Sequence, residues 1–272
     1  MNVDKRYGAL TAYVVGYLVF LYGPVLLLPL FSFNNSLYIS FPLKGFTFEW
    51  YRQMVDNEQL MESLQASLKV AVGVSVVSTI LGVLAAKALT QYYLPGRGAI
   101  TGFLMLPLVI LSLVLALALL FIMRRVFDAE LSLYTVAAGH VMLCVPYSML
   151  VMISRLDGFD RNLEEASFDL GESAWQTFWR ITFPLAWPGI VSSLLLCFSA
   201  SFDEYVLAAF LSGNQTTLPV FIYSQLRFPQ RLPGVLALGS CILVGSVVMV
   251  TLSEWIRRRG VQPQEAARGL AA

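Results

Sequence analysis

Two adjacent acids lie inside a long apolar stretch of the sequence. Asp203 and Glu204 occur in the segment Ser-Ala-Ser-Phe-Asp-Glu-Tyr-Val-Leu-Ala-Ala-Phe, which also contains Tyr205. An ionisable group at membrane depth costs at least roughly 2.5–3.5 kcal/mol and usually faces a cavity or a partner. The pair therefore indicates a site that attracts a cation. The alternative is a structural pair that backbone groups, water or an arginine satisfy. Adjacent helical residues point about 100° apart, so in a helix at most one of the acids faces a pathway directly.

Other residues with chemical potential are few and scattered. His140 is the only histidine, and it is either a hydrogen-bonding residue between packed helices or a second pathway residue. The three cysteines lie in apolar runs without the spacing of a disulfide framework or a metal site. The sequence contains no Walker loop, nucleophile elbow or metal-ligand cluster. We therefore expect no enzymatic activity, no ATP hydrolysis by this chain and no directly bound cofactor.

The composition is that of a membrane protein. Hydrophobic residues make up 57% of the 272 residues and charged residues only 13%, whereas soluble domains carry roughly 25% charged residues. A helix that crosses a bilayer needs about 20 apolar residues. Several charge-free runs are long enough, and they cover 7–43, 98–123, 131–154, 181–202 and 232–253.

These runs predict an all-α integral membrane protein with six transmembrane helices, at about 8–32, 64–90, 99–123, 132–154, 188–212 and 234–256. The corresponding organisation has a first helix with an outer loop (1–63), a core of five helices (64–257) and a tail (258–272). A seventh span over 205–226 is not expected, because that stretch is rich in loop residues.

The distribution of Lys and Arg predicts the orientation. An even number of spans puts both termini on one side of the membrane, and that side collects 11 of the 18 Lys and Arg residues. Arg257, Arg258 and Arg259, directly after the last span, are the strongest anchor. We therefore expect both termini in the cytoplasm. The aromatic outer loop 33–63 then forms an interfacial belt with a short amphipathic helix, or part of a docking surface for an external partner.

The inner loop, at about 155–187, carries six acids against three arginines. Its sequence favours two short helices joined at Gly171, which can take a left-handed conformation. Ser173 and Gln176 have the spacing of a capping box at the start of the second helix. A rigid acidic element of this kind suits insertion into a groove of another protein, and the alternative is a solvated connector.

This loop resembles the EAA loop of bacterial ATP-binding-cassette (ABC) importer permeases. The family pattern is Glu-Ala-Ala, three residues, Gly, nine residues, Ile, one residue and Leu-Pro. The corresponding residues here are Glu165-Ala166-Ser167, Gly171, Ile181 and Phe183-Pro184. Ser167 replaces the second alanine and Phe183 replaces the leucine. The resemblance covers roughly residues 60–257.

The resemblance implies the type I ABC importer permease fold in a bacterial inner membrane. In that family the loop is a coupling helix that docks into the ATPase. The implied coupling residues are Glu164, Glu165, Ala166, Ser167, Gly171, Ile181 and Pro184. The implied partners are a second, similar permease, two ATPase subunits that bind ATP and Mg²⁺, and a periplasmic solute-binding protein. The lipid bilayer is the remaining partner, and no nucleic acid is expected.

The solute is indicated by a further resemblance. The segment from Ser201 to Tyr205, with His140 through Tyr147, is similar to the spermidine/putrescine branch of these permeases. An acidic lining with Asp203 and Glu204 suits polyamines, which are multivalent cations. Opines, amino-acid-like amines and aminophosphonates are alternative solutes within this branch.

Two other functions remain to be compared with the importer. A self-contained channel or secondary carrier would need its own coupling to a gradient, and Asp203, Glu204 and His140 could in principle relay protons. A membrane-embedded enzyme would need a clustered catalytic set inside the spans, and the sequence shows none.

Overall fold

The chain folds into helices that divide into two compact units. A computed structural model describes residues 3–38, 41–157, 162–248 and 251. The first unit consists of Met1–Glu58 together with Ile222–Ala272, and the second of Gln59–Phe221. The described residues contain no strand beyond one isolated β-bridge between Asn34 and Phe46, which agrees with the predicted all-α class. The expected boundaries at 63/64 and 257/258 remain predictions.

The first unit contains the N-terminal and C-terminal spans. Helix α1 (Val3–Ser32) is long and apolar, and α2 (Glu49–Val55) is the short helix expected in the outer loop. The loop between them is held by specific bonds: Trp50 Nε1 donates to the Asn34 carbonyl at 2.9 Å, and the Ser32 and Tyr51 hydroxyls lie 2.6 Å apart. The loop is therefore folded. Its use as a docking surface stays a prediction.

The last span of this unit is a helix over Pro229–Val248 that begins with the single 3₁₀ turn η2 (Pro229–Arg231). Helix α11 (Leu218–Gln225) crosses the boundary between the units. Residues 158–161 of the inner loop, the predicted anchor at 257–259 and the predicted tail over 258–272 lie outside the described residues.

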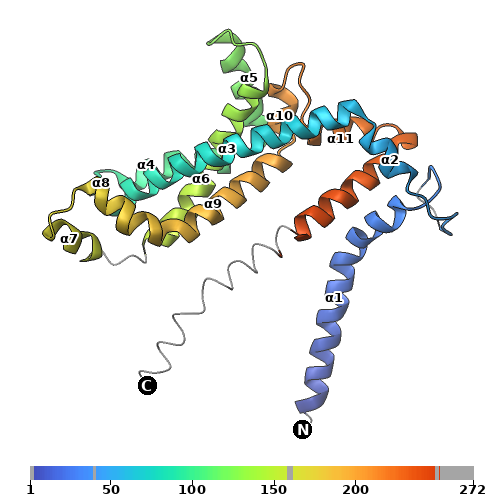
Figure 1. The fold of residues 1–272 in the computed structure, drawn as a ribbon, viewed down its shortest axis with the longest axis horizontal. Coiled ribbons are helices and arrows are strands. Elements are labelled where there is room, and N and C mark those ends of the chain that lie inside the picture. The colour runs from blue at the N-terminus through green and yellow to red at the C-terminus, as the bar shows by residue number, and fades with distance from the viewer. Residues whose placement is uncertain (1–2, 39–40, 158–161, 249–250, 252–272) are drawn as a thin grey trace. The chain divides into compact units, whose positions relative to one another are not determined.

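The second unit is a bundle in which α6 packs along α9 (Figure 1). Its long helices are α3 (Glu58–Gln91), α6 (Leu133–Leu156) and α9 (Phe183–Asp203). The shorter elements are α4 (Arg97–Val109), α5 (Ser112–Arg125), α7 (Asn162–Asp169), α8 (Ala174–Thr177), the π-helix η1 (Phe178–Thr182) and α10 (Val206–Leu211).

Small residues let α3 and α6 approach closely. A Cβ atom added to Gly82 would lie 2.2 Å from Ser148 Oγ and 2.9 Å from the Met149 backbone nitrogen. Small side chains at helix contacts are typical of membrane bundles, in which close packing and hydrogen bonds drive association. The buried face of α3 accordingly carries Ser67, Ser75 and Ser78.

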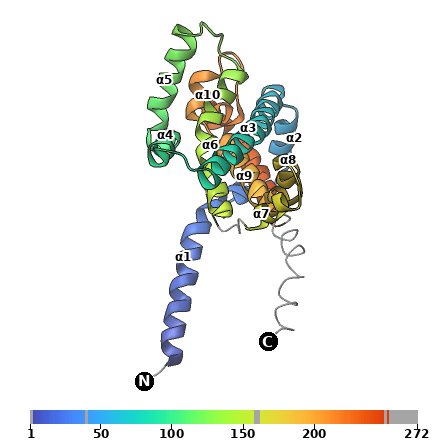
Figure 2. The same ribbon diagram turned by 90° about the vertical axis from the view of Figure 1, so that its left-hand side faces the viewer.

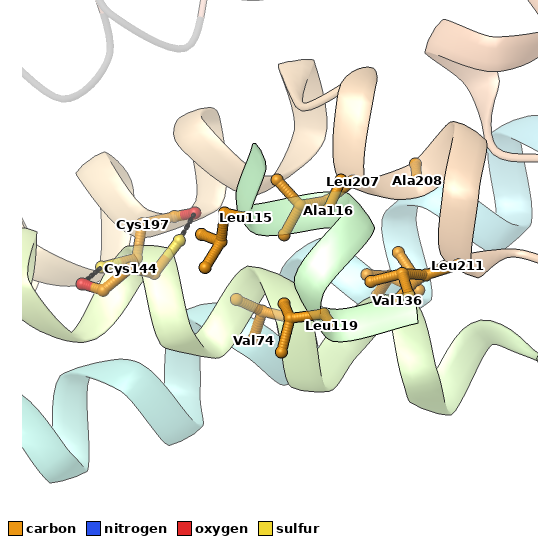
Figure 3. Close-up of a cluster of buried hydrophobic side chains, with 11 residues drawn as sticks. Val74, Leu115, Ala116, Leu119, Val136, Cys144, Cys197, Leu207, Ala208 and Leu211 are labelled. Carbon is orange, nitrogen blue, oxygen red and sulfur yellow. Dashed lines mark hydrogen bonds between the residues drawn. The ribbon is translucent and has the colours of Figure 1, made fainter. Parts of the chain in front are cut away.

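A buried apolar cluster ties the helices of the second unit together. Leu115, Ala116 and Leu119 of α5 pack with Leu207 and other residues of α10 (Figure 3). In the same cluster Cys144 and Cys197 each direct the thiol toward the other's backbone carbonyl, with sulfur–oxygen distances of 3.7 and 3.4 Å. These cysteines are buried packing residues, as their apolar surroundings predict.

The third predicted span, over 99–123, consists of two helices with a sharp bend between them. Helices α4 and α5 meet at an angle of 101° (Figure 2), and Ile110 and Leu111 have extended backbone angles between them. Neither residue is a helix breaker by type, but Pro107 lies inside α4 three residues before the break. On the other side of the bend, α5 packs against α10. With this pair counted as one broken span, the described residues contain six spans, as predicted.

The α3–α6 crossing gives a test with a matched control. We expect Gly82→Ala to destabilise the purified protein by about 1–3 kcal/mol, because the added methyl group must displace Ser148 or the α6 backbone. Gly73→Ala adds the same group on the same helix, where nothing lies within 4 Å. Thermal unfolding in detergent should therefore show a loss only for Gly82→Ala. Equal melting temperatures for both variants would contradict the close crossing.

Candidate functional site

The loop between α6 and α9 folds as a hairpin, defined here as residues 162–182. Helix α7 ends at Asp169, and Gly171 has a φ of +84°, the left-handed conformation expected from its position. The Gly171 N–H donates to the Phe168 carbonyl at 2.9 Å and the Glu172 N–H to the Ser167 carbonyl at 3.1 Å. Residues other than glycine are strained at this φ, although a Cβ would meet open space.

The second arm of the hairpin begins at the predicted capping box. The Ser173 hydroxyl accepts the Gln176 backbone N–H at 3.4 Å, and the Gln176 side chain accepts the Ser173 N–H at 2.9 Å. The prediction of a separate second short helix was wrong. Helix α8 continues through η1 into α9, so that Ala174–Asp203 is one span of 30 residues. A π turn of this kind is rare and frequently occurs at functional sites.

Ser167 connects the two arms. Its hydroxyl lies 2.9 Å from the Thr177 hydroxyl, and the two side chains are buried. The family pattern has alanine at this position, and the extra hydroxyl is satisfied here by a partner on α8. The departure from the pattern is therefore compatible with the hairpin.

The two neighbouring acids of α7 point in different directions. Glu164 is turned inward, and its carboxylate contacts Gln91 and Lys87 of α3 and Thr182 of η1. Glu165 is exposed. Sequence reasoning treated the two acids alike, because the partners of Glu164 are far away in the sequence.

The outer face of the hairpin is apolar as well as acidic. Leu170 is 85% exposed and Trp175 is 69% exposed. Ala166 and Pro184 are exposed too, and Ile181 is half-buried in η1. Large exposed apolar side chains next to a charged face are typical of an interaction surface.

The acidic pair lies at a break in the helix and not within a continuous span over 188–212. Helix α9 ends at Asp203, Glu204 has an extended ψ of 109°, and α10 begins at Val206. The Glu204 carboxylate accepts the backbone N–H groups of Val206 at 3.0 Å and Leu207 at 3.2 Å. It therefore satisfies donors that the interrupted helix leaves without a partner.

A cavity of about 180 Å³ opens beside this break. Seven residues line it: His140, Leu143, Cys144, Tyr147, Ala200, Ser201 and Glu204. Of the predicted pathway residues, the structure brings together His140 and Glu204. Asp203 is exposed and does not line the cavity. Tyr205 directly precedes α10 and does not line the cavity either.

His140 is a hydrogen-bonding residue between packed helices and also lines the cavity, while its role in a solute pathway stays a prediction. Its Nδ1 lies 2.9 Å from Ser201 Oγ, which joins α6 to α9. Its Nε2 is buried without a partner in the described part of the chain. Sequence reasoning missed Tyr147 and Ser201 as cavity residues. Helical spacing can find them, because Tyr147 lies two turns after His140 and Ser201 lies one turn before Glu204.

The comparison with known proteins identifies the family. The profile of the family described as "Binding-protein-dependent transport system inner membrane component" matches residues 72–261. This chain belongs to that family. It is 33% identical over 256 residues to the spermidine/putrescine transport system permease protein PotC of Haemophilus influenzae, covering 94% of this chain and 98% of PotC.

Other relatives agree with this membership. PotC of Escherichia coli K12 is 33% identical over 240 residues, which cover 88% of this chain and 90% of that protein. The putrescine transport system permease protein PotI of the same organism is 33% identical over 243 residues, which cover 87% and 85% of the two chains.

The fold is that of solved importer permeases. A chain of a bacterial ABC transporter involved in the import of the acidic polysaccharide alginate has a TM-score of 0.75 at 18% identity, covering 93% of this permease and 98% of that chain. The same kind of transporter in complex with an alginate pentasaccharide-bound periplasmic protein gives a TM-score of 0.71 at 18% identity, covering 94% of each.

The chain is therefore a permease subunit of an ABC importer and a multi-pass protein of the inner membrane. Its fold, with six spans, is the one that the sequence predicts. The relatives are transport permeases, which is consistent with the expected non-enzymatic role.

The Ser167–Thr177 bond gives a prediction for the permease hairpin. Thr177→Val alone should destabilise the hairpin by about 1–3 kcal/mol, because it leaves the buried Ser167 hydroxyl without its hydrogen-bond partner. Ser167→Ala combined with Thr177→Val removes both hydroxyls and should be milder than Thr177→Val alone. Limited proteolysis of the hairpin in the purified protein measures the difference. A double variant that is cleaved faster than Thr177→Val would contradict the buried pair.

Proposed function

We propose that this permease imports a polyamine-like cation and that the cavity at the end of α9 is part of the solute pathway. The observation that supports the solute is the Glu204 carboxylate beside the cavity. Irregular backbone at membrane depth is tolerated where it lines a cavity or is buried in protein. An acidic side chain at the same place attracts a cationic solute.

The size and lining of the cavity suit one end of a linear amine. A volume of about 180 Å³ corresponds to roughly six water molecules at about 30 Å³ each. Glu204 supplies negative charge, His140 and Tyr147 supply polar groups, and Leu143 and Ala200 supply apolar surface for methylene groups. The relatives named for spermidine and putrescine transport favour a polyamine over the opine, amino-acid-like amine and aminophosphonate alternatives.

The proposed assembly contains a second permease, two ATPase subunits and a periplasmic binding protein. The hairpin docks to an ATPase through Glu165, Ala166 and the exposed apolar side chains around Gly171, on the cytoplasmic side where both termini lie. ATP and Mg²⁺ bind to the ATPase subunits. ATP-driven closure of the ATPase pair moves the hairpins, and the cavity opens toward the loaded binding protein.

The acidic residues give the test of the proposed solute site. In vesicles that contain the complete transporter, we expect Glu204→Gln to lower ATP-driven uptake of spermidine or putrescine by about tenfold, as expected for loss of a charged contact. The glutamine oxygen can still accept the Val206 and Leu207 N–H groups, so the start of α10 should persist.

Asp203→Asn is the matched variant, because it removes the same charge one residue away and outside the cavity. We expect a clearly smaller loss for it, and the uptake assay with labelled amine measures both. A normal rate for Glu204→Gln, or a greater loss for Asp203→Asn, would show that the cavity does not bind the cation. Uptake that needs a pH gradient and no ATP would instead support a secondary carrier.

A further inference from the structure

Glu164 joins the hairpin to the last turns of α3. Its Oε2 accepts a hydrogen bond from Gln91 Nε2 at 2.8 Å, and its Oε1 lies 3.8 Å from Lys87 Nζ. The same Oε1 accepts a hydrogen bond from Thr182 Oγ1 in η1. One carboxylate on α7 therefore holds two other elements of the second unit. We call Glu164 with Lys87, Gln91 and Thr182 the Glu164 cluster.

The Glu164 cluster is sheltered from solvent. The side chain of Glu164 is 14% exposed and that of Lys87 is 23% exposed, while Thr182 is 2% exposed. Lys87 Nζ also lies 5.0 Å from the centroid of the Phe178 ring in η1, a cation–π contact that adds a further link to α3. Sheltered, multiply bonded charges interact more strongly than single pairs on an exposed surface.

The elements held by the Glu164 cluster continue into helices that contact other parts of the second unit. Helix α3 continues to the close contact of Gly82 with α6. The π-helix η1 continues into α9, which ends at the cavity beside Glu204. A displacement of α7 that keeps the cluster intact must therefore displace the end of α3 and the start of α9 together.

We propose that Glu164 is a positioning residue that transmits the motion of the hairpin to α3 and α9, and that it does not bind the ATPase itself. This inference rests on the proposed docking of the hairpin to an ATPase. The inference gives the two neighbouring acids different roles, because Glu164 is bonded to α3 and Glu165 is exposed. Loss of Glu164 should leave the ATPase bound and weaken the link between ATP hydrolysis and transport.

The experiment compares Glu164→Ala with the exchange Glu164→Gln/Gln91→Glu in the complete transporter. The exchange keeps an amide–carboxylate pair between α7 and α3, leaves an acceptor for Thr182, and places the carboxylate one turn from Lys87. Asp169→Ala is the control, because Asp169 is an exposed acid on the same helix. The readouts are amine transported per ATP hydrolysed and the amount of ATPase that co-purifies.

We expect Glu164→Ala to lower transport per ATP by about tenfold with the ATPase retained, since hydrogen bonds to a charge are lost. The exchange should recover most of this loss, and Asp169→Ala should stay within about twofold of the wild type. Recovery by the exchange is the decisive result, because a carboxylate moved to α3 cannot restore a direct contact between residue 164 and the ATPase.

Three results would overturn the inference. These are normal transport per ATP in Glu164→Ala, loss of the ATPase from that variant, and an exchange variant that is no better than Glu164→Ala. If Glu164→Ala does not insert, the single variants Glu164→Gln and Gln91→Ala replace it, and normal coupling in both contradicts the proposal. A wild-type complex without ATP-driven uptake would contradict the proposed function itself. Failure of the proposed function can therefore be distinguished from failure of the inference about Glu164.

Discussion

The first N–H groups of a helix have no partner within that helix, and this constraint determines how α10 can begin. The chain leaves α9 at Asp203 and starts α10 with N–H groups that no preceding turn can satisfy. The Glu204 carboxylate accepts two of them. The side chain that caps the start of α10 is therefore the one that we propose to supply negative charge for the solute. Under this proposal one residue has a structural role and a binding role.

One continuous span connects the proposed ATPase contact with the proposed solute pathway. The helix over Ala174–Asp203 has 30 residues, which corresponds to a length of about 45 Å at 1.5 Å per residue. It begins at the capping box of the hairpin and ends at the cavity. A stiff helix transmits a displacement from one end to the other, so no series of weak contacts between separate elements is needed. The π turn at Phe178–Thr182, where the Glu164 cluster attaches, is the irregular segment near its start.

The features that the sequence predicted are those with local causes. Charge-free runs predict spans because their length matches the bilayer, and Ser173 with Gln176 predicts a capping box because the spacing itself makes the bonds. The bend at Ile110–Leu111 was not predicted, because neither residue is a helix breaker and the helix that packs against α5, α10, is distant in the sequence. The opposite orientations of Glu164 and Glu165 were missed for the same reason, since the partners of Glu164 lie on α3 and η1.

The most direct measurement is an electron cryomicroscopy structure of the complete transporter trapped with its amine. We predict an amine nitrogen within about 4 Å of the Glu204 carboxylate, the distance of an ion pair, with the start of α10 still capped. Density for the solute at another place in the membrane, with the cavity beside His140 empty, would contradict it and leave Glu204 as a helix cap alone.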